Sequence, residues 1–188
     1  MFLFDKTLIS GLIYCNDFLS KAEEVDLIKR IDQENWLTDL KRRVQHYGYK
    51  YDYRARRIDT SMHIGHLPSW LDGLAQQLYN EDCFDKKPDQ VIINEYLPGQ
   101  GISAHIDCEP CFADTIVSIS LGSYCVMEFS SNSEKIPILL EPRSVVVLKG
   151  ESRYKWTHAI LPKKKDIING ISYERARRIS LTFRKVII

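Results

Sequence analysis

Three side chains that can bind a metal ion stand out in the sequence. His105 and Asp107 are two positions apart in a stretch that follows a Pro-Gly turn. Because alternate residues of an extended chain point the same way, the imidazole and the carboxylate face one point. His158, further along the chain, fits the place of a third ligand. Two histidines and one carboxylate form the facial triad that holds non-haem Fe(II) and leaves positions open for substrate and O₂.

A run near the C-terminus adds two cations that can bind an acid. Alternation puts four polar side chains on one face of a predicted strand, namely Arg178, Ser180, Thr182 and Arg184. Each guanidinium can form a bidentate, charge-assisted pair with a carboxylate, so two of them beside a metal indicate a dicarboxylate ligand. A solvated edge strand is the alternative interpretation.

Two further segments support a site at this place, since a His-x-Asp tripeptide alone is more often structural. Asn94 and Tyr96 share a face of the strand that leads to the histidine turn, and both could donate hydrogen bonds to the same acid. A strand tyrosine alone is more often part of a core. The Gly-Glu-Ser-Arg sequence at residues 150–153 predicts a turn that positions the strand bearing His158.

Helices in the first half of the chain and strands in the second half must position these groups. Ser20 and Glu23 form a capping box that begins a helix ending near Glu34, and a second helix is predicted from Pro68 to Asn80. Short β-branched and aromatic runs predict strands over residues 91–97, 115–121, 125–129, 136–140, 144–148, 158–161 and 179–186. We therefore expect a mainly β (α+β) fold, a double-sheet jelly roll with helices packed on one face.

Length and composition favour one globular domain. The chain has 188 residues, 44% hydrophobic and 27% charged, which is typical of a soluble domain and excludes a disordered chain. The formal net charge is +1, so attraction to nucleic acid has to come from local clusters. Asp5 and Lys6 interrupt the apolar start, and no later run approaches the roughly 20 apolar residues of a membrane span. We expect a soluble intracellular protein with no membrane partner.

The five cysteines are an odd number and are scattered along the chain: Cys15, Cys83, Cys108, Cys111 and Cys125. This usage favours a reducing compartment and free thiols. Cys108 and Cys111 form a C-x-x-C directly after the candidate metal ligands, which could indicate zinc or a redox pair. No second C-x-x-C or nearby histidine pair is present, so a four-ligand zinc site cannot be assembled locally.

Together these segments resemble the AlkB family of Fe(II)- and 2-oxoglutarate-dependent dioxygenases, in order and spacing, over roughly residues 88–186. The motifs are Asn94-Glu95-Tyr96-x-Pro98-Gly99, His105-x-Asp107, Ser118-x-Ser120-Leu121-Gly122, Gly150-Glu151-Ser152-Arg153, His158, and Arg178 through Arg184. Residues 87–107 and 42–49 look most like the family member that hydroxylates a modified wobble uridine in tRNA. That member also carries an RNA-recognition module and a methyltransferase, for which this chain has no room.

The resemblance implies one dioxygenase domain over residues 1–188. Its residues 1–89 would hold the helices and a nucleotide lid, and residues 90–188 a double-stranded β-helix core. Iron would lie on His105, Asp107 and His158, with 2-oxoglutarate chelating the metal and O₂ as the oxidant.

The resemblance also implies roles for the residues around the dicarboxylate. Arg178 would pair with the distal carboxylate, assisted by Tyr96, and Arg184 with Asn94 would contact the carboxylate next to the keto group. The bacterial prototype of the family has asparagine in place of Ser180. A hydroxyl can still donate one hydrogen bond, so we expect binding of the cosubstrate to persist.

Residues 41–57 form a candidate nucleotide lid, with seven lysines and arginines against one acid. An extended strand would put four alternating tyrosines on one face and the basic residues, Arg42 and Arg43 among them, at its ends: Tyr47, Tyr49, Tyr51 and Tyr53. Aromatic stacking with flanking cations holds unstacked bases. An amphipathic edge strand whose tyrosines cover the core is the alternative. Arg143 and residues 163–165, three lysines, could extend the basic surface.

The leading hypothesis is a monomeric enzyme that oxidatively demethylates alkylated bases in single-stranded DNA or tRNA. Its expected location is the cytoplasm, or the nucleus in a eukaryote. A hydroxylase of the wobble-uridine side chain in tRNA is the first alternative, and a protein hydroxylase the second. A catalytically idle metal-binding module is disfavoured, because the triad and both arginines are complete.

Overall fold

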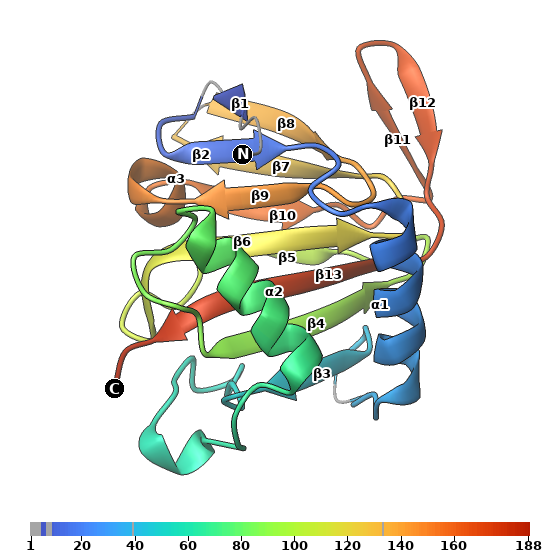
Figure 1. Ribbon diagram of the computed structural model, residues 1–188. Coiled ribbons are helices and arrows are strands. Elements are labelled where there is room, and N and C mark those ends of the chain that lie inside the picture. The colour runs from blue at the N-terminus through green and yellow to red at the C-terminus, as the bar shows by residue number, and fades with distance from the viewer. Residues whose placement is uncertain (1–4, 7–8, 39, 133) are drawn as a thin grey trace.

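Two antiparallel sheets form the body of the molecule (Figure 1). The structure is a computed structural model that describes residues 5–6, 9–38, 40–132 and 134–188. The larger sheet has the order β1 (Asp5–Lys6), β2 (Leu12–Cys15), β9 (Val145–Leu148), β6 (Phe112–Leu121), β13 (Arg178–Val186), β4 (Gln90–Tyr96) and β3 (Val44–Tyr47). The smaller sheet has the order β5 (Ile102–His105), β10 (Thr157–Ile160), β7 (Cys125–Ser131) and β8 (Glu134–Leu140). The predicted jelly roll is confirmed. A separate hairpin, β11 (Lys165–Ile168) and β12 (Ile171–Glu174), projects from it.

The two faces of the larger sheet have different partners because side chains alternate along each strand. On β13, Leu181 and Phe183 are fully buried in the core that lies under the helices. The neighbouring residues of the same strand, Ser180 and Thr182, turn the other way and line a cavity. The predicted alternation of this strand is therefore confirmed, and it delivers a polar face to the interior of the jelly roll.

Helices α1 (Lys21–Gln33) and α2 (Ser69–Asn80) cover the outer face of the larger sheet (Figure 1). The predicted capping box begins α1: the backbone N–H of Glu23 donates to the Ser20 hydroxyl over 3.2 Å, and the Ser20 N–H donates to the Glu23 carboxylate over 2.7 Å. Helix α2 begins at Ser69, one residue after the predicted start, and Pro68 occupies its N-cap position without a side-chain hydrogen bond. No helix among the described residues is both long and apolar enough to cross a membrane.

Several elements differ from the sequence-based expectation. Strands β1 and β2 of the first half join the larger sheet although no strand is predicted there, and β3 covers only part of the strand expected over residues 41–57. Such short strands carry little local signal, because their partners lie far away in the chain. Residues 150–153 begin a short helix, α3 (Gly150–Tyr154), where the prediction was a turn. A 3₁₀ turn, η1 (Thr60–Met62), and β5 were also not foreseen.

The tyrosine-rich segment is not one strand, so its four tyrosines do not share a face. β3 ends at Tyr47, whose ring packs edge-on against Trp70 of α2 at 5.7 Å between centroids. Gly48 then has φ +76°, and a Cβ there would come within 1.9 Å of the Asp89 carbonyl oxygen. Only glycine fits this close approach, and the chain turns away from the sheet after it. Tyr51 and Tyr53 lie beyond the bend and line the cavity, with ring centroids 5.0 Å apart.

A buried carboxylate ties β3, β4 and α1 together on the helix side of the larger sheet. Glu95 of β4 accepts hydrogen bonds from Arg43 Nε and Nη2 at 2.6 and 2.7 Å, and from Arg177 Nε at 2.6 Å. Arg177 also forms an ion pair with Asp32 of α1. Hydrogen bonds from Arg43, followed by those from Arg177, outweigh the effect of burial and lower the pKa of Glu95.

Replacing Glu95 by glutamine is expected to lower the free energy of unfolding by about 1.5–3 kcal/mol at neutral pH, the usual worth of hydrogen bonds to a charged group. Because the folded-state pKa of Glu95 is lowered, this stabilisation is present above its unfolded pKa of about 4.3 and is lost as pH falls through the folded value. Chemical denaturation of wild type and Glu95→Gln at pH 7 and in acid checks this. A difference that stays constant into acid would contradict it.

Candidate metal centre and adjoining cavity

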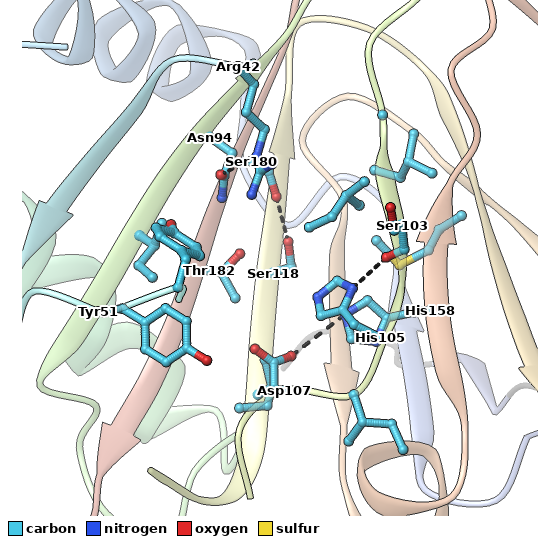
Figure 2. Close-up of a pocket in the computed structure, with 18 of the residues that line it drawn as sticks. Arg42, Tyr51, Asn94, Ser103, His105, Asp107, Ser118, His158, Ser180 and Thr182 are labelled. Atoms are coloured by element: carbon cyan, nitrogen blue, oxygen red, sulfur yellow. Dashed lines mark hydrogen bonds and ion pairs between the residues drawn. The ribbon is translucent and has the colours of Figure 1, made fainter. Parts of the chain in front are cut away.

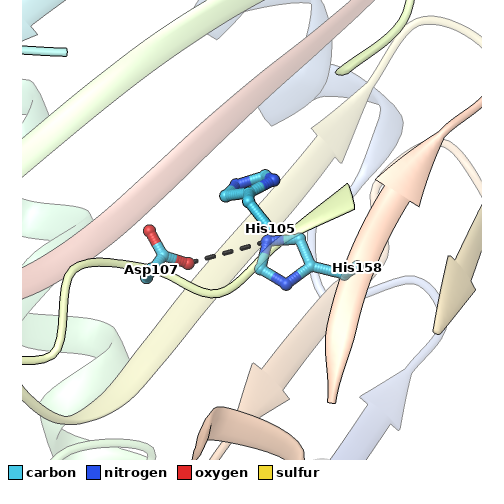
Figure 3. Close-up of side chains that lie close together, drawn as sticks. All are labelled: His105, Asp107 and His158. Atoms are coloured by element: carbon cyan, nitrogen blue, oxygen red, sulfur yellow. Dashed lines mark ion pairs between the residues drawn. The ribbon is translucent and has the colours of Figure 1, made fainter. Parts of the chain in front are cut away.

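Three side chains converge between the sheets (Figure 3). His105 ends β5 and His158 lies opposite it on β10, so strand pairing brings the two rings to 4.3 Å between centroids. Asp107 follows β5, and its Oδ2 lies 3.6 Å from His158 Nε2. One ligand atom from each residue lies within 4.8 Å of the others, and among the described residues this is the group that could hold a metal ion. The predicted triad is therefore assembled in space.

The protonation states suit a metal. Burial lowers the pKa of His158 to about 4, so its imidazole is neutral at physiological pH. Burial alone would raise the pKa of Asp107, but the positive charge of Arg184 and smaller effects of His158 and His105 hold it well below its usual range. His105 Nδ1 lies 2.8 Å from the Ser103 carbonyl, and donation there leaves Nε2 free for a metal.

Arg184 contacts a metal ligand. Its Nε and Nη2 donate to Asp107 Oδ1 at 2.9 and 2.6 Å, which orients the carboxylate and leaves Oδ2 toward His158. We expect Arg184 and Asn94 to contact the same carboxylate of 2-oxoglutarate, but in this structure the two side chains bond to different residues. Asn94 lies opposite Ser180 on the neighbouring strand and accepts a hydrogen bond from Arg42 Nε at 2.8 Å.

Arg178 is a buried cation with unused donors. Its exposed fraction is 2%, and its Nη2 donates to Ser120 Oγ at 2.7 Å. Nε and Nη1 are buried and have no hydrogen-bond partner among the residues that the structure describes. The guanidinium lies 5.5 Å from the centre of the Tyr96 ring. Leaving such donors unpaired is costly, so the arrangement fits an anionic ligand, as a carboxylate would be.

A cavity of about 670 Å³ connects these groups (Figure 2). Its lining includes the triad, beside Arg184 near the end of β13, and Arg178, Tyr96 and Asn94 at the start of that strand, with Ser180 and Thr182 between them. The Ser180 hydroxyl lies 2.8 Å from that of Ser118, so the two share a hydrogen bond. Tyr51, Tyr53 and Arg56 from the tyrosine-rich segment complete the wall, whereas Tyr47 and Tyr49 do not line it.

Two arginines that we did not foresee fix the loop bearing Asp107. Arg153 of α3 is 2% exposed and donates to the backbone carbonyls of Asp107 and Cys108 at 3.0 and 3.3 Å. Arg56 donates to the carbonyl of Ile106 at 3.1 Å. Arg153 belongs to the Gly-Glu-Ser-Arg motif, which in the sequence indicates only a turn that positions His158. Because α3 also leads into β10, this helix positions both the loop that carries Asp107 and the strand that carries His158.

Cys108 and Cys111 form a disulfide, which corrects the expectation of free thiols at these positions. Their Cα atoms lie 5.3 Å apart, the close approach that a C-x-x-C turn allows. The three other cysteines are buried and form no disulfide among the described residues. Both bonded sulfur atoms lie near the Arg56 carbonyl, so the disulfide lies between the metal loop and the tyrosine-rich segment.

Some of the expected basic surface is engaged in ion pairs. Arg43 is held by Glu95 on the helix side and does not reach the cavity. Arg143 pairs with Asp17 and Glu24 at 2.6 and 3.4 Å. Both guanidiniums already have acidic partners, and a contact of Arg43 or Arg143 with phosphate stays a prediction. Lys163, Lys164 and Lys165 are exposed beside the hairpin.

The comparisons with known proteins agree with this geometry. Residues 35–184 match the 2OG-Fe(II) oxygenase superfamily. The alkylated DNA repair protein ALKBH8 homolog of Arabidopsis thaliana is 38% identical over 95% of this chain and 59% of its own length. The tRNA (carboxymethyluridine(34)-5-O)-methyltransferase alkbh8 of Xenopus tropicalis is 37% identical over 94% of this chain, which spans only 32% of that protein.

Two more distant matches come from sequence and from solved structures. A DNA N6-methyl adenine demethylase of Caenorhabditis elegans is 27% identical over 94% of this chain and 60% of its own. The solved structure of OsALKBH1 superposes with a TM-score of 0.74, over 97% of this chain and 100% of that one, at 17% identity. At that identity the likeness concerns the fold alone.

Proposed function

The chain belongs to the 2OG-Fe(II) oxygenase superfamily as an AlkB-like member, and on that basis we propose that it hydroxylates a C–H bond of a uridine in tRNA. Members of this superfamily are oxidoreductases that use Fe(II), 2-oxoglutarate and O₂. When bound, the iron with its 2-oxo acid activates O₂, because decarboxylation of the acid supplies two electrons.

The protein supplies ligands and charges for this chemistry. His105, Asp107 and His158 would hold the iron, with Arg184 keeping Asp107 oriented. Arg178 would pair with the distal carboxylate of 2-oxoglutarate beside Tyr96. The observation that carries this assignment is the pair of buried guanidinium nitrogens of Arg178 without a partner among the described residues, in the same cavity as the triad.

The wall made by the tyrosine-rich segment supports a nucleic-acid base as the substrate. Tyr51 and Tyr53 offer aromatic surfaces to the cavity, and a base must leave its stack before iron can reach it. Burial raises the pKa of Tyr53 to about 12, so its hydroxyl remains a donor. That hydroxyl is buried and has no partner among the described residues. Lys50, Arg54 and Arg57 are exposed on the same segment and could contact phosphates.

Similarity in sequence favours tRNA hydroxylation over demethylation, which is the leading hypothesis from the sequence alone. The four relatives whose names include ALKBH8 are 36–39% identical to this chain, and three of them are named for a uridine of tRNA, whereas the DNA demethylase is 27% identical. Demethylation remains the second candidate, because the same C–H hydroxylation on an N-methyl carbon gives a hemiaminal that releases formaldehyde. Hydroxylation of a ring substituent instead leaves a stable alcohol.

Mass spectrometry separates the two candidates. The protein is incubated with Fe(II), 2-oxoglutarate and either total tRNA or N-methylated oligonucleotides, with His105→Ala as the inactive control. One added oxygen on a tRNA uridine supports the proposal, and loss of a methyl group as formaldehyde supports demethylation. Turnover of 2-oxoglutarate without a product on either nucleic acid would contradict both and favour a protein substrate.

Tyr51→Ala is expected to weaken RNA binding by about 1–3 kcal/mol, the worth of stacking one base on an aromatic ring. Tyr49→Ala is the matched control, because Tyr49 packs on His63 and does not line the cavity. Fluorescence anisotropy at two salt concentrations measures both. Tyrosine carries no charge, so the salt dependence of binding should not change. Equal losses in the two variants would argue against Tyr51 as a stacking residue.

A further inference from the structure

The edge of the larger sheet carries two rows of side chains, one on each face. Opposite residues on antiparallel strands share a face, and Tyr96 lies opposite Arg178, while Val44 lies opposite Asn94. The Glu95 N–H donates to the Arg43 carbonyl at 3.0 Å, so the pairing of β3 with β4 continues toward the start of the segment. Residues 43, 95 and 177 thus form a row on the helix side, and residues 42, 96 and 178 a row on the cavity side.

In the row on the helix side, the positive and negative side chains pair with one another. Two guanidiniums, those of Arg43 and Arg177, flank the Glu95 carboxylate and bond to it at 2.6–2.7 Å. Asp32 supplies a second acid to Arg177. Each cation of this row has a carboxylate partner.

The row on the cavity side repeats the two arginines without the acid. Arg42 and Arg178 flank Tyr96, with guanidinium carbons 5.7 and 5.5 Å from the centre of its ring. The hydrogen-bond partners of these two cations are neutral, the Asn94 side-chain oxygen and the Ser120 hydroxyl, and neither cation has an ion pair among the described residues. Two like charges beside one ring repel each other unless an anion lies between them.

We propose that Arg42 is a second cationic ligand of the cosubstrate, which holds the distal carboxylate of 2-oxoglutarate together with Arg178. This inference rests on the proposed function, since it takes the cavity to be the cosubstrate site. The ligand carboxylate supplies beside Tyr96 the negative charge that Glu95 supplies in the other row. Arg42 therefore makes the site selective for a dicarboxylate over a 2-oxo acid with an apolar end.

A contact between Arg42 and RNA phosphate is the competing role. Figure 2 shows the Arg42 side chain running into the cavity toward Asn94 and Ser180. Its Nε is already directed by the bond to Asn94 Oδ1, on the strand that forms the cavity wall. This orientation favours the small anion inside over a phosphate at the surface.

Isothermal titration of the Mn(II)-loaded protein tests the proposal without turnover. The ligands are 2-oxoglutarate and 2-oxopentanoate, which has a methyl group in place of the distal carboxylate. Arg42→Met should weaken 2-oxoglutarate binding about 10- to 100-fold, the loss expected for one charge-assisted pair, and leave 2-oxopentanoate binding unchanged. Arg42→Lys should restore part of the affinity.

Arg43→Met is the matched control, because it removes the same charge from the other face of the sheet. It should lower thermal stability and keep the wild-type affinity for 2-oxoglutarate. If Arg42→Met retains wild-type affinity for 2-oxoglutarate, loses affinity for both acids equally, or alters only RNA binding, the proposal is overturned. Wild-type protein that binds neither acid would overturn the proposed function itself.

Discussion

Alanine in place of His105, Asp107 or His158 is expected to abolish the conversion of 2-oxoglutarate to succinate. Changes to residues that merely orient a metal ligand typically cost about 10- to 100-fold in metal affinity or activity, so loss of a ligand should cost more. His105→Ala is the cleanest variant, since His105 is half-buried and, among the described residues, its ring hydrogen-bonds to the Ser103 carbonyl alone. Iron titration and succinate assays measure the effect.

Asp107→Ala should have a second consequence that His105→Ala lacks. It leaves the Arg184 guanidinium, whose side chain is 10% exposed, without its carboxylate. An uncompensated buried charge destabilises a fold, so its melting temperature should fall below that of His105→Ala. Any of the three variants that turned over 2-oxoglutarate at the wild-type rate would show that its residue is not a ligand.

Arg178→Ala is expected to raise the 2-oxoglutarate concentration needed for turnover by about 10- to 100-fold, because it removes a charge-assisted pair with the distal carboxylate. Iron binding should be unaffected, since Arg178 lies at the start of β13, whereas the triad lies beside Arg184 near the end of that strand. Arg178→Lys should rescue only part of the affinity, because an ammonium lacks the planar fork of a guanidinium. Calorimetric titration of each variant checks this.

Arg178→Met separates a binding role from a structural one. Two buried nitrogens of Arg178 have no partner among the described residues, so an apolar side chain of similar length should leave the ligand-free protein as stable as wild type or more so. Loss of cosubstrate affinity without loss of stability is the expected result. A large drop in melting temperature with normal affinity would instead make Arg178 a structural residue.

Much of the site could be predicted because it depends on local alternation. His105 and Asp107 are two residues apart, and the polar face of β13 follows from a period of two, so the sequence shows which side chains point together. The capping box likewise marks the start of α1 from four residues alone. Such features need no knowledge of distant partners.

The rest depends on tertiary contacts that no local pattern contains. Alternation places Arg184 on the correct face, but only the fold shows that it bonds to Asp107. Gly48 reads as one small residue within a strand, yet the close approach of the Asp89 carbonyl forces the bend that separates Tyr47 from Tyr51. The adjacent residues Arg42 and Arg43 look equivalent in sequence and face opposite sides of the sheet.

A cavity-side row with two cations and no acid would also link the folding of this protein to 2-oxoglutarate, the ligand proposed for it. The repulsion between Arg42 and Arg178 is carried by the folded, ligand-free state and is absent from the unfolded chain, where the two residues are far apart. A ligand that binds only the folded state adds about 2.7 kcal/mol at a concentration of 100 times its dissociation constant. The amount of folded protein in a cell would therefore rise and fall with the supply of 2-oxoglutarate, because proteases remove unfolded chains. Starvation for the cosubstrate would then reduce the number of enzyme molecules as well as their rate.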